Sequence, residues 1–183
     1  MRKRLRPAYP ASELPTVYPS TYDHTRWPDH LDRVAQTITF AHTAFPQAVS
    51  VADLSCGDAA IAQALADHWD ADSILGDLVA GYEHHGQIED TIHAVGPVDV
   101  FICSETLEHI DDPDHLLEQI RATASRLILS TPCDETITNL EHYWAWGAAD
   151  IAAMLERAGW QPVAFQFIEY PDLDVRYQLW AAR

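Results

Sequence analysis

The chain has 183 residues, 48% of them hydrophobic, which fits one globular domain with a full core and excludes a disordered segment. Its formal net charge is −17, and four of the 11 basic residues lie within the first six positions. The rest of the chain therefore carries 28 acidic residues against 7 basic ones. Because Lys and Arg supply most of the affinity for phosphate backbones, a free polynucleotide is disfavoured unless a partner or the basic tail supplies the charge.

From the sequence we expect neither a membrane span nor a secretion signal. No apolar run approaches the roughly 20 residues that span a bilayer, and the basic start is followed by Pro7 and polar residues instead of an apolar core. The three cysteines, Cys56, Cys103 and Cys133, form no closely spaced pair. An odd number without such a pair predicts free thiols in a reducing compartment, so we expect a cytoplasmic protein with no membrane partner.

The chain opens with an arm and a helix. Residues 1–27 are rich in Pro, Tyr and Thr without a clear period, which predicts an extended arm before a domain over residues 28–183. Pro28 suits the first turn of a helix, and apolar residues from Leu31 to Ala41 follow at helical spacing. This pattern predicts a helix over residues 28–44.

Strand and helix patterns alternate along the middle of the chain. Strands are expected at 49–54, 72–76, 84–88, 98–103 and 126–131, and helices at 59–68, 112–124 and 147–158. This alternation predicts a mostly parallel sheet with helices on both faces. The last two strands, 161–170 and 175–182, have no helix between them and predict an antiparallel hairpin at the sheet edge. The expected fold is a single-domain, Rossmann-like α/β domain.

The segment 51–62, Val-Ala-Asp-Leu-Ser-Cys-Gly-Asp-Ala-Ala-Ile-Ala, is expected to form a buried strand, a turn of small residues and the start of a helix. Unpaired N–H groups and the positive dipole end at such a turn suit a nucleotide-like cofactor. An ordinary strand-to-helix turn is the alternative.

Two later strand ends extend this cofactor hypothesis. Asp77 follows Asp53 by 24 residues and can accept hydrogen bonds from ribose hydroxyls, or else act as a helix N-cap. Gln87 and Ile88 can meet the edge and the face of an adenine, or else form a surface turn.

These motifs together resemble the class I S-adenosylmethionine-dependent methyltransferases. The first motif of that family, D-x-G-x-G-x-G, corresponds to residues 53–59, where Ser55 and Ala59 replace glycines. The strand followed by E-x-L-E-H corresponds to residues 98–109, and it is similar to ubiquinone-type O-methyltransferases and small-RNA 3′-end 2′-O-methyltransferases. The S-T-P after Leu129 and the helix that ends in A-G-W are also similar.

The resemblance implies S-adenosylmethionine as the cofactor, with the adenine near Leu78, Gln87 and Ile88 and the ribose at Asp77. Ser104 would lie beneath the sulfonium, and the first motif would approach the methionine part. The implied cofactor residues are Asp53, Ser55, Cys56, Gly57, Asp77, Leu78, Gln87, Ile88 and Ser104.

A second group of residues, Glu105, Glu108, His109 and His142, combines two carboxylates with two imidazoles. Such a set can ligate one divalent metal, which would bind and acidify a substrate hydroxyl. Without a metal, Glu108, His109 and His142 are candidates for direct acid–base catalysis. In the simplest alternative, Glu108 and His109 only cap and orient the helix that follows.

Three functions stay open at this point. The first is S-adenosylmethionine-dependent methylation of a small or terminal acceptor, at oxygen. The second is metal-dependent 2′-O-methylation of a nucleic-acid end or a nucleotide. The third is a non-catalytic cofactor-binding module, suggested by the replaced glycines. The acceptor pocket is expected from residues 133–146 and the arm. The stretch 22–30, with Tyr22, His24, Trp27 and His30, is either a lid over the site or a packing arm.

Overall fold

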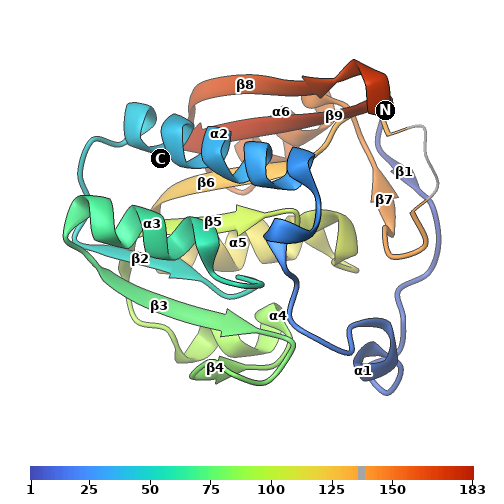
Figure 1. Cartoon of the computed structure of the whole chain (residues 1–183), viewed down its shortest axis with the longest axis horizontal. Helices are drawn as coiled ribbons and strands as arrows, with labels where there is room; N and C mark the ends of the chain where they lie inside the picture. Colours follow the sequence, from blue (N-terminus) through green and yellow to red (C-terminus); the bar gives the residue numbers. More distant parts are fainter. Residues whose placement is uncertain (136–138) are drawn as a thin grey trace.

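A computed structural model describes residues 1–135 and 139–183. Its main feature is a seven-stranded sheet in the order β4-β3-β2-β5-β6-β9-β8 (Figure 1). The strands are β2 (Ser50–Asp53), β3 (Asp72–Asp77), β4 (His84–His85), β5 (Val98–Ser104), β6 (Ala124–Pro132), β8 (Pro162–Tyr170) and β9 (Val175–Ala182). The strands from β4 to β6 pair in parallel, and β9 pairs antiparallel with both β6 and β8. The predicted parallel sheet with a C-terminal hairpin is thus confirmed.

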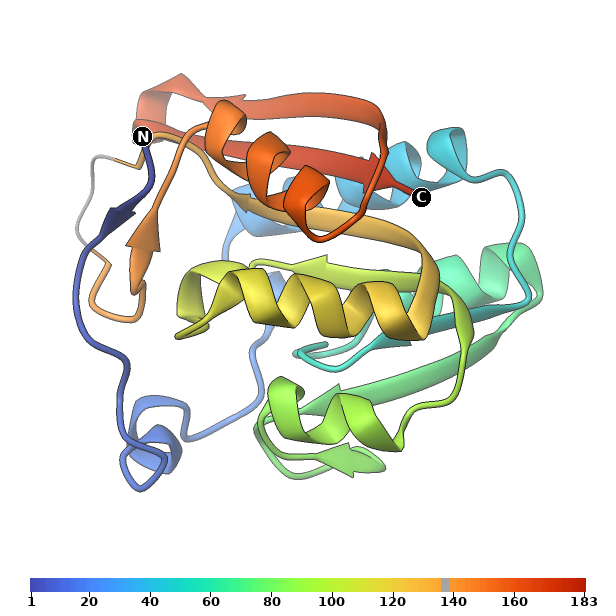
Figure 2. The same cartoon turned by 180° about the vertical axis from the view of Figure 1, so that it is seen from behind.

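Helices cover both faces of this sheet. α2 (Pro28–Ala44) and α3 (Ala60–Trp69) lie on one face, and α4 (Ile88–Thr91), α5 (Pro113–Thr123) and α6 (Ala148–Arg157) lie on the other (Figures 1 and 2). Both faces of the sheet must be covered by helices, because the side chains of β5 alternate between two apolar cores. Val100 and Ile102 pack on the α2 side, whereas Phe101 and Cys103 pack on the α5 side. A strand buried on both faces reads as a continuous apolar run.

Helix α2 has the bounds expected from the sequence. Pro28 occupies its first turn, where a missing N–H costs no hydrogen bond, and Trp27 before it is extended. The buried face of α2 carries Val34 and Phe40 together with one charged side chain, Arg33. That arginine lies at the end of the helix nearest to the carboxyl ends of the strands and belongs to the site described below.

The expected strand over 84–88 is wrong in its second half. Only His84 and His85 pair with β3, and the chain turns at Gly86, whose φ is 142°. From Ile88 it forms the short helix α4, because Glu89 and Asp90 in the first turn favour a helix start through their interaction with its positive end.

The arm over residues 1–27 contains more structure than its composition predicts. It holds β1 (Lys3–Arg4), α1 (Leu14–Val17) and the 3-10 turn η1 (His24–Arg26). β1 pairs antiparallel with β7 (Trp144–Ala145), far along the chain. Three further 3-10 turns are η2 (Ile92–Ala94), η3 (Leu107–His109) and η4 (Pro171–Leu173).

Two basic residues at the start of the chain form ion pairs within the protein. Arg2 is paired with Asp114 and Arg4 with Asp111. The guanidinium of Arg2 also lies over the ring of Trp144, 4.0 Å from its centroid. These contacts fasten the first residues of the arm to the body of the domain. In the part of the chain that the structure describes, no helix has the length and apolar character to cross a membrane.

Ala59 provides a test of the turn before α3. This residue is buried and left-handed, with φ 61° and ψ 14°, a conformation that glycine adopts without a Cβ penalty. We predict that Ala59→Gly raises the free energy of unfolding by about 0.5 kcal/mol, since the relieved strain exceeds the added backbone entropy. Ala60→Gly, one residue into the helix, should lower it by a similar amount. Urea denaturation of both variants measures this, and equal losses of stability would contradict a strained turn at Ala59.

Candidate active site

A cavity of about 950 Å³ lies at the carboxyl ends of the parallel strands. The chain order reverses between β2 and β5, and ligands of doubly wound sheets bind at such a switch point. In Figure 1 the dark-blue arm runs past the arrowheads of β2, β3 and β5. Arm residues such as Tyr9, Tyr18 and Tyr22 line the cavity together with the strand-end loops, so the arm forms one of its walls.

The turn after β2 is held in shape by its own side chains. The buried carboxylate of Asp53 accepts a hydrogen bond from the N–H of Ser55 at 3.1 Å. Burial raises the pKa of Asp53 to about 7. Gly57 is left-handed, with φ 57°, and Ala59 follows in the same region of backbone space. Ser55 and Ala59 therefore preserve a tight turn despite replacing glycines.

Asp77 ties this turn to the end of β3. One oxygen of its carboxylate accepts the N–H of Gly57 at 2.9 Å, and the other accepts the N–H of Val79 at 2.9 Å. Asp77 therefore bridges two loops and does not cap a helix. Each carboxylate oxygen has a second lone pair, which leaves acceptor capacity for a ligand in the cavity that Asp77 lines.

Most of the residues proposed to bind the cofactor surround the same space. Asp53 and Cys56 are buried beneath the turn and do not line the cavity. The other seven do line it: Ser55, Gly57, Asp77, Leu78, Gln87, Ile88 and Ser104. Their roles toward a cofactor remain predictions.

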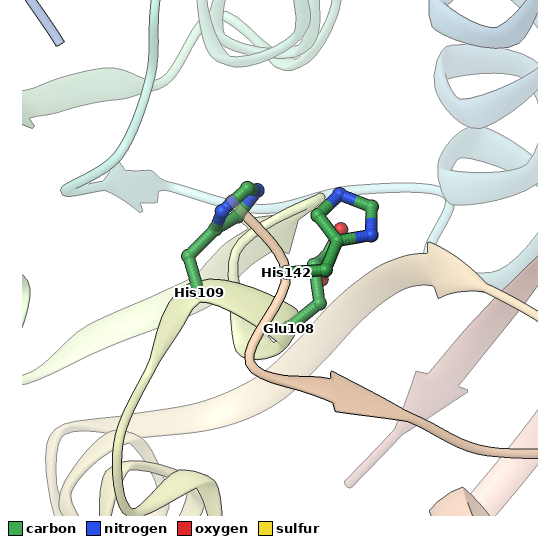
Figure 3. A group of neighbouring side chains, drawn as sticks. All are labelled: Glu108, His109 and His142. Carbon is green, nitrogen blue, oxygen red and sulfur yellow. The ribbon is translucent and has the colours of Figure 1, made fainter. Parts of the chain in front are cut away.

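Glu108, His109 and His142 form a compact cluster in the cavity wall (Figure 3). Each offers a ligand atom that lies within 4.8 Å of the other two. Glu108 and His109 come from η3, directly after β5, and His142 comes from the loop that leads to β7. The N–H of Tyr143 donates to the carbonyl of Glu108 at 2.7 Å, which joins the two segments.

Hydrogen bonds orient both imidazoles. Nδ1 of His109 lies 3.1 Å from the carbonyl oxygen of Glu141, so this nitrogen carries the proton. Burial lowers the pKa of His109 to about 3, and its ring is therefore neutral with a free lone pair on Nε2. Nδ1 of His142 lies 2.7 Å from the carboxylate of Glu135, and Nε2 lies 3.0 Å from the Asn139 amide. Burial disfavours a charged His142, but the hydrogen bond to Glu135 and the charges of Glu108, Glu135 and Glu105 together outweigh burial and raise the pKa of His142.

Glu108 is the least satisfied group of the cluster. Its side chain is 1% exposed; Oε2 accepts from the Thr131 hydroxyl at 3.0 Å, while Oε1 has no partner among the described residues. Burial raises its pKa to about 8. A buried carboxylate oxygen without a partner costs free energy that a metal ion or a ligand donor would recover. Neutral imidazoles whose Nδ1 is held by an oxygen are also the usual form of metal-binding histidines.

Glu105, the fourth predicted metal ligand, points elsewhere. Its Oε1 accepts from the Ser130 hydroxyl at 2.8 Å and lies 3.9 Å from the guanidinium of Arg33. Its backbone has φ 52°, a strained value for a residue with a Cβ. The structure thus gathers three of the four predicted ligands and pairs the fourth with a buried arginine.

Several residues of the site could not be predicted from the sequence motifs. Tyr18 lies 3.1 Å from Nδ1 of His109, and no spacing in the arm indicates this contact. Glu135 and Asn139 precede His142 by seven and three residues, and this proximity in the chain is a weak signal for them. Of the aromatic and histidine residues noted in the stretch 22–30, Tyr22 and His24 of the arm and His30 of α2 line the cavity. Trp27 is 49% exposed and does not.

The buried carboxyl of Glu108 predicts a specific pH dependence of stability. Its folded-state pKa lies above the ordinary 4.5, so unfolding releases a proton between about pH 4.5 and 8 and stability falls as the pH rises through that window. Glu108→Gln removes this loss, and its free energy of unfolding relative to wild type should rise by about 1–3 kcal/mol from pH 5 to pH 8.

Urea denaturation with EDTA present measures the effect without metal. Glu118→Gln, an exposed change, serves as the control. Because wild type and both variants retain Asp53, differences between them isolate Glu108. An equal pH dependence in Glu108→Gln and Glu118→Gln would contradict the buried, uncharged carboxyl.

Solved structures of methyltransferases share the fold of this chain. The 1,6-didemethyltoxoflavin-N1-methyltransferase of Burkholderia thailandensis, with bound 1,6-didemethyltoxoflavin and S-adenosylhomocysteine, is 15% identical over 100% of this chain and 94% of that chain, with a TM-score of 0.71. The N-methyltransferase NodS of Bradyrhizobium japonicum WM9, in complex with S-adenosylhomocysteine, is 14% identical over 86% and 88%, with a TM-score of 0.66. The magnesium protoporphyrin IX methyltransferase ChlM of Synechocystis PCC 6803, with bound S-adenosylmethionine, is 18% identical over 85% and 80%, with a TM-score of 0.62.

The family assignment comes from the sequence. No curated protein matches the chain significantly. A family model described as a methyltransferase domain matches residues 22–165, which include the turn after β2, Asp77 and the cluster of Glu108, His109 and His142. This match covers well over half of the chain, and the protein therefore belongs to the methyltransferase domain family.

Proposed function

We propose that this protein transfers the methyl group of S-adenosylmethionine to a hydroxyl oxygen of a small or terminal acceptor. The observation that carries the proposal is the shared cavity, with the turn after β2 and Asp77 on one side and Glu108, His109 and His142 on another. A volume of about 950 Å³ lies near the upper end of ordinary ligand pockets and leaves room for two molecules.

The residues that surround the cavity fit the proposed cofactor. Asp77 presents acceptor oxygens to ribose hydroxyls, and Gln87 and Ile88 offer a polar and an apolar surface to adenine. Arg33 is 3% exposed and donates to the Ser104 hydroxyl at 3.1 Å. Its Nε has no partner among the residues that the structure describes, which suits the methionine carboxylate. The methyltransferases with similar folds hold S-adenosylmethionine or its demethylated product in their structures.

The cofactor supplies an activated methyl group on a sulfonium, so the protein must mainly position the acceptor and accept its proton. His142 suits proton transfer because Glu135 orients its ring and favours its protonated form. His109 suits it poorly, since a ring with a pKa of about 3 is a weak base. A neutral His109 is better fitted to bind a metal ion or an acceptor hydroxyl through Nε2.

A metal-assisted form of this reaction is a second candidate, and the orphaned Oε1 of Glu108 favours it. Glu108, His109 and His142 would hold a divalent ion, which supplies a Lewis acid beside the acceptor hydroxyl. Small-RNA 3′-end methyltransferases share the motif, and a nucleotide or nucleic-acid end belongs to this candidate. The net charge of −17 and the internally paired Arg2 and Arg4 support a small acceptor over a free polynucleotide.

Binding of the cofactor is the first test. We predict that calorimetry detects S-adenosylhomocysteine bound to the wild-type protein, and that Asp77→Asn weakens binding by about tenfold to a hundredfold through lost charged hydrogen bonds. Asp90→Asn, an exposed change outside the cavity, should bind as wild type does. A folded wild-type protein that binds neither S-adenosylhomocysteine nor S-adenosylmethionine would refute the proposal.

Metal binding separates the two candidates. If the ion is present, Mn²⁺ added to EDTA-treated protein should raise its melting temperature, and both Glu108→Gln and His142→Ala should abolish that rise by removing a ligand. Glu105→Gln should keep it, because Glu105 lies with Arg33 outside the cluster. No response to Mn²⁺ or Mg²⁺ in the wild type leaves the metal-free reaction, with His142 as the base, as the surviving candidate.

A further inference from the structure

The arm contacts the domain along its length, including Tyr18 against His109, and each of its two ends carries an attachment. Its first residues pair with β7 and carry the contacts of Arg2 and Arg4 described above. Its last residues, around His24, reach the turn after β2. Between the two attachments, Tyr9, Tyr18 and Tyr22 line the cavity. The arm therefore spans the site and is fixed at each end.

His24 makes the second attachment through Asp58, which lies within the turn between Gly57 and Ala59. The backbone N–H of His24 donates to one oxygen of Asp58 at 2.9 Å, and its Nδ1 lies 2.6 Å from the other. The His24 side chain is 12% exposed. Partial burial would raise the pKa of Asp58, but the hydrogen bonds from His24 and from the N–H of Ala60 together lower it.

The backbones of the arm and the turn also touch directly. A Cβ added at Gly57 would lie 3.2 Å from the carbonyl oxygen of Tyr22 and 3.3 Å from its Cβ. Both atoms belong to the arm, so a side chain at this position would push against the closed arm. A glycine is required here both by its left-handed backbone and by the close approach of the arm.

On its other side, Gly57 is already held by the body of the domain. Its N–H donates to Asp77, and its carbonyl accepts from the Tyr82 hydroxyl at 2.8 Å. These bonds do not involve the arm. The turn can therefore keep its shape when the arm leaves. Two side-chain links, His24 to Asp58 and Tyr18 to His109, hold this part of the arm over the cavity, and of these two the first reaches the turn.

We propose that His24 is a positioning residue of the cofactor site, which latches the arm onto the turn through Asp58 and must release it when the cofactor enters or leaves. This inference rests on the proposed function, because it requires a cofactor beneath the arm. Of the two attachments, the one at His24 is the weaker. The other combines strand pairing, two arginine–carboxylate pairs and a guanidinium stacked on Trp144.

The test uses S-adenosylhomocysteine and the full chain in stopped-flow binding. His24→Ala should raise the dissociation rate constant by about tenfold, the loss expected for one charged hydrogen bond. The association rate constant should rise as well, since the site is open more often. Asp58→Asn should shift both rate constants in the same direction. This variant keeps a side-chain oxygen that can accept the hydrogen bond that the N–H of Ala60 donates to Asp58 at 3.1 Å.

His115→Ala is the matched control, because His115 lies on α5 outside the cavity with its side chain 61% exposed. Hydrogen exchange distinguishes a latch, which protects only the arm, from a residue that stabilises the whole fold. Amides of residues 18–27 should exchange faster in His24→Ala than in His115→Ala, with unchanged exchange in β2 and β5 and a similar melting temperature.

Two results would overturn the latch. Unchanged binding rates in both His24→Ala and Asp58→Asn would show that the pair does not control access. Faster exchange across β2 and β5 together with the arm would show that His24 only stabilises the whole fold. Failure of the wild type to bind S-adenosylhomocysteine is a different outcome, because it would refute the proposed function and the latch with it.

Discussion

The site depends on how the backbone turn between β2 and α3 is held. Asp53 accepts an N–H from within the turn, Asp77 accepts the N–H of Gly57, and Tyr82 donates to its carbonyl. These bonds pair backbone groups of the turn that the sheet and the helix leave without partners. They fix the turn between β3 on one side and the arm on the other, and every other part of the cavity is arranged around it.

Beside this turn, the cluster of Glu108, His109 and His142 lowers the stability of the folded protein, and the fold itself does not require these buried groups. Glu108 is buried, and one of its carboxylate oxygens has no partner within residues 1–135 and 139–183. Burial also keeps the ring of His109 neutral. Ordinary cores avoid such groups, whereas binding sites retain them because a ligand restores the missing interaction. Glu105 shows the contrast, because its charge is met by Arg33 and by the Ser130 hydroxyl. The unmet bonding capacity therefore lies at Glu108, where the acceptor or its metal would bind.

Much of the fold follows from periodic patterns in the sequence. The bounds of α2 match the expected 28–44, and the C-terminal hairpin matches two predicted strands with no helix between them. The strand expected over 84–88 fails because short segments carry few residues to establish a period, and Glu89 and Asp90 stabilise a helical turn instead. The pairing of β1 with β7 is equally hidden, since two-residue strands joined over long range leave no local pattern.

The candidate site, like the fold, could be predicted from the sequence only in part. Local motifs indicate the turn, Asp77 and the E-x-x-E-H segment, because their spacing follows from strands that end at one sheet edge. Contacts between distant segments could not be predicted in this way. Tyr18 against His109, His24 against Asp58 and Arg33 against Glu105 each depend on how the arm and α2 cross the strand ends.

The most direct test of the central claim is methyl transfer itself. The purified protein should move tritiated methyl from S-adenosylmethionine into a fraction of small molecules from host extract, in a product with the chemical stability of an O-methyl ether. That result would establish catalysis at oxygen in the cavity described. A protein that binds the cofactor yet labels no fraction, or whose product carries the methyl group on nitrogen, would contradict it.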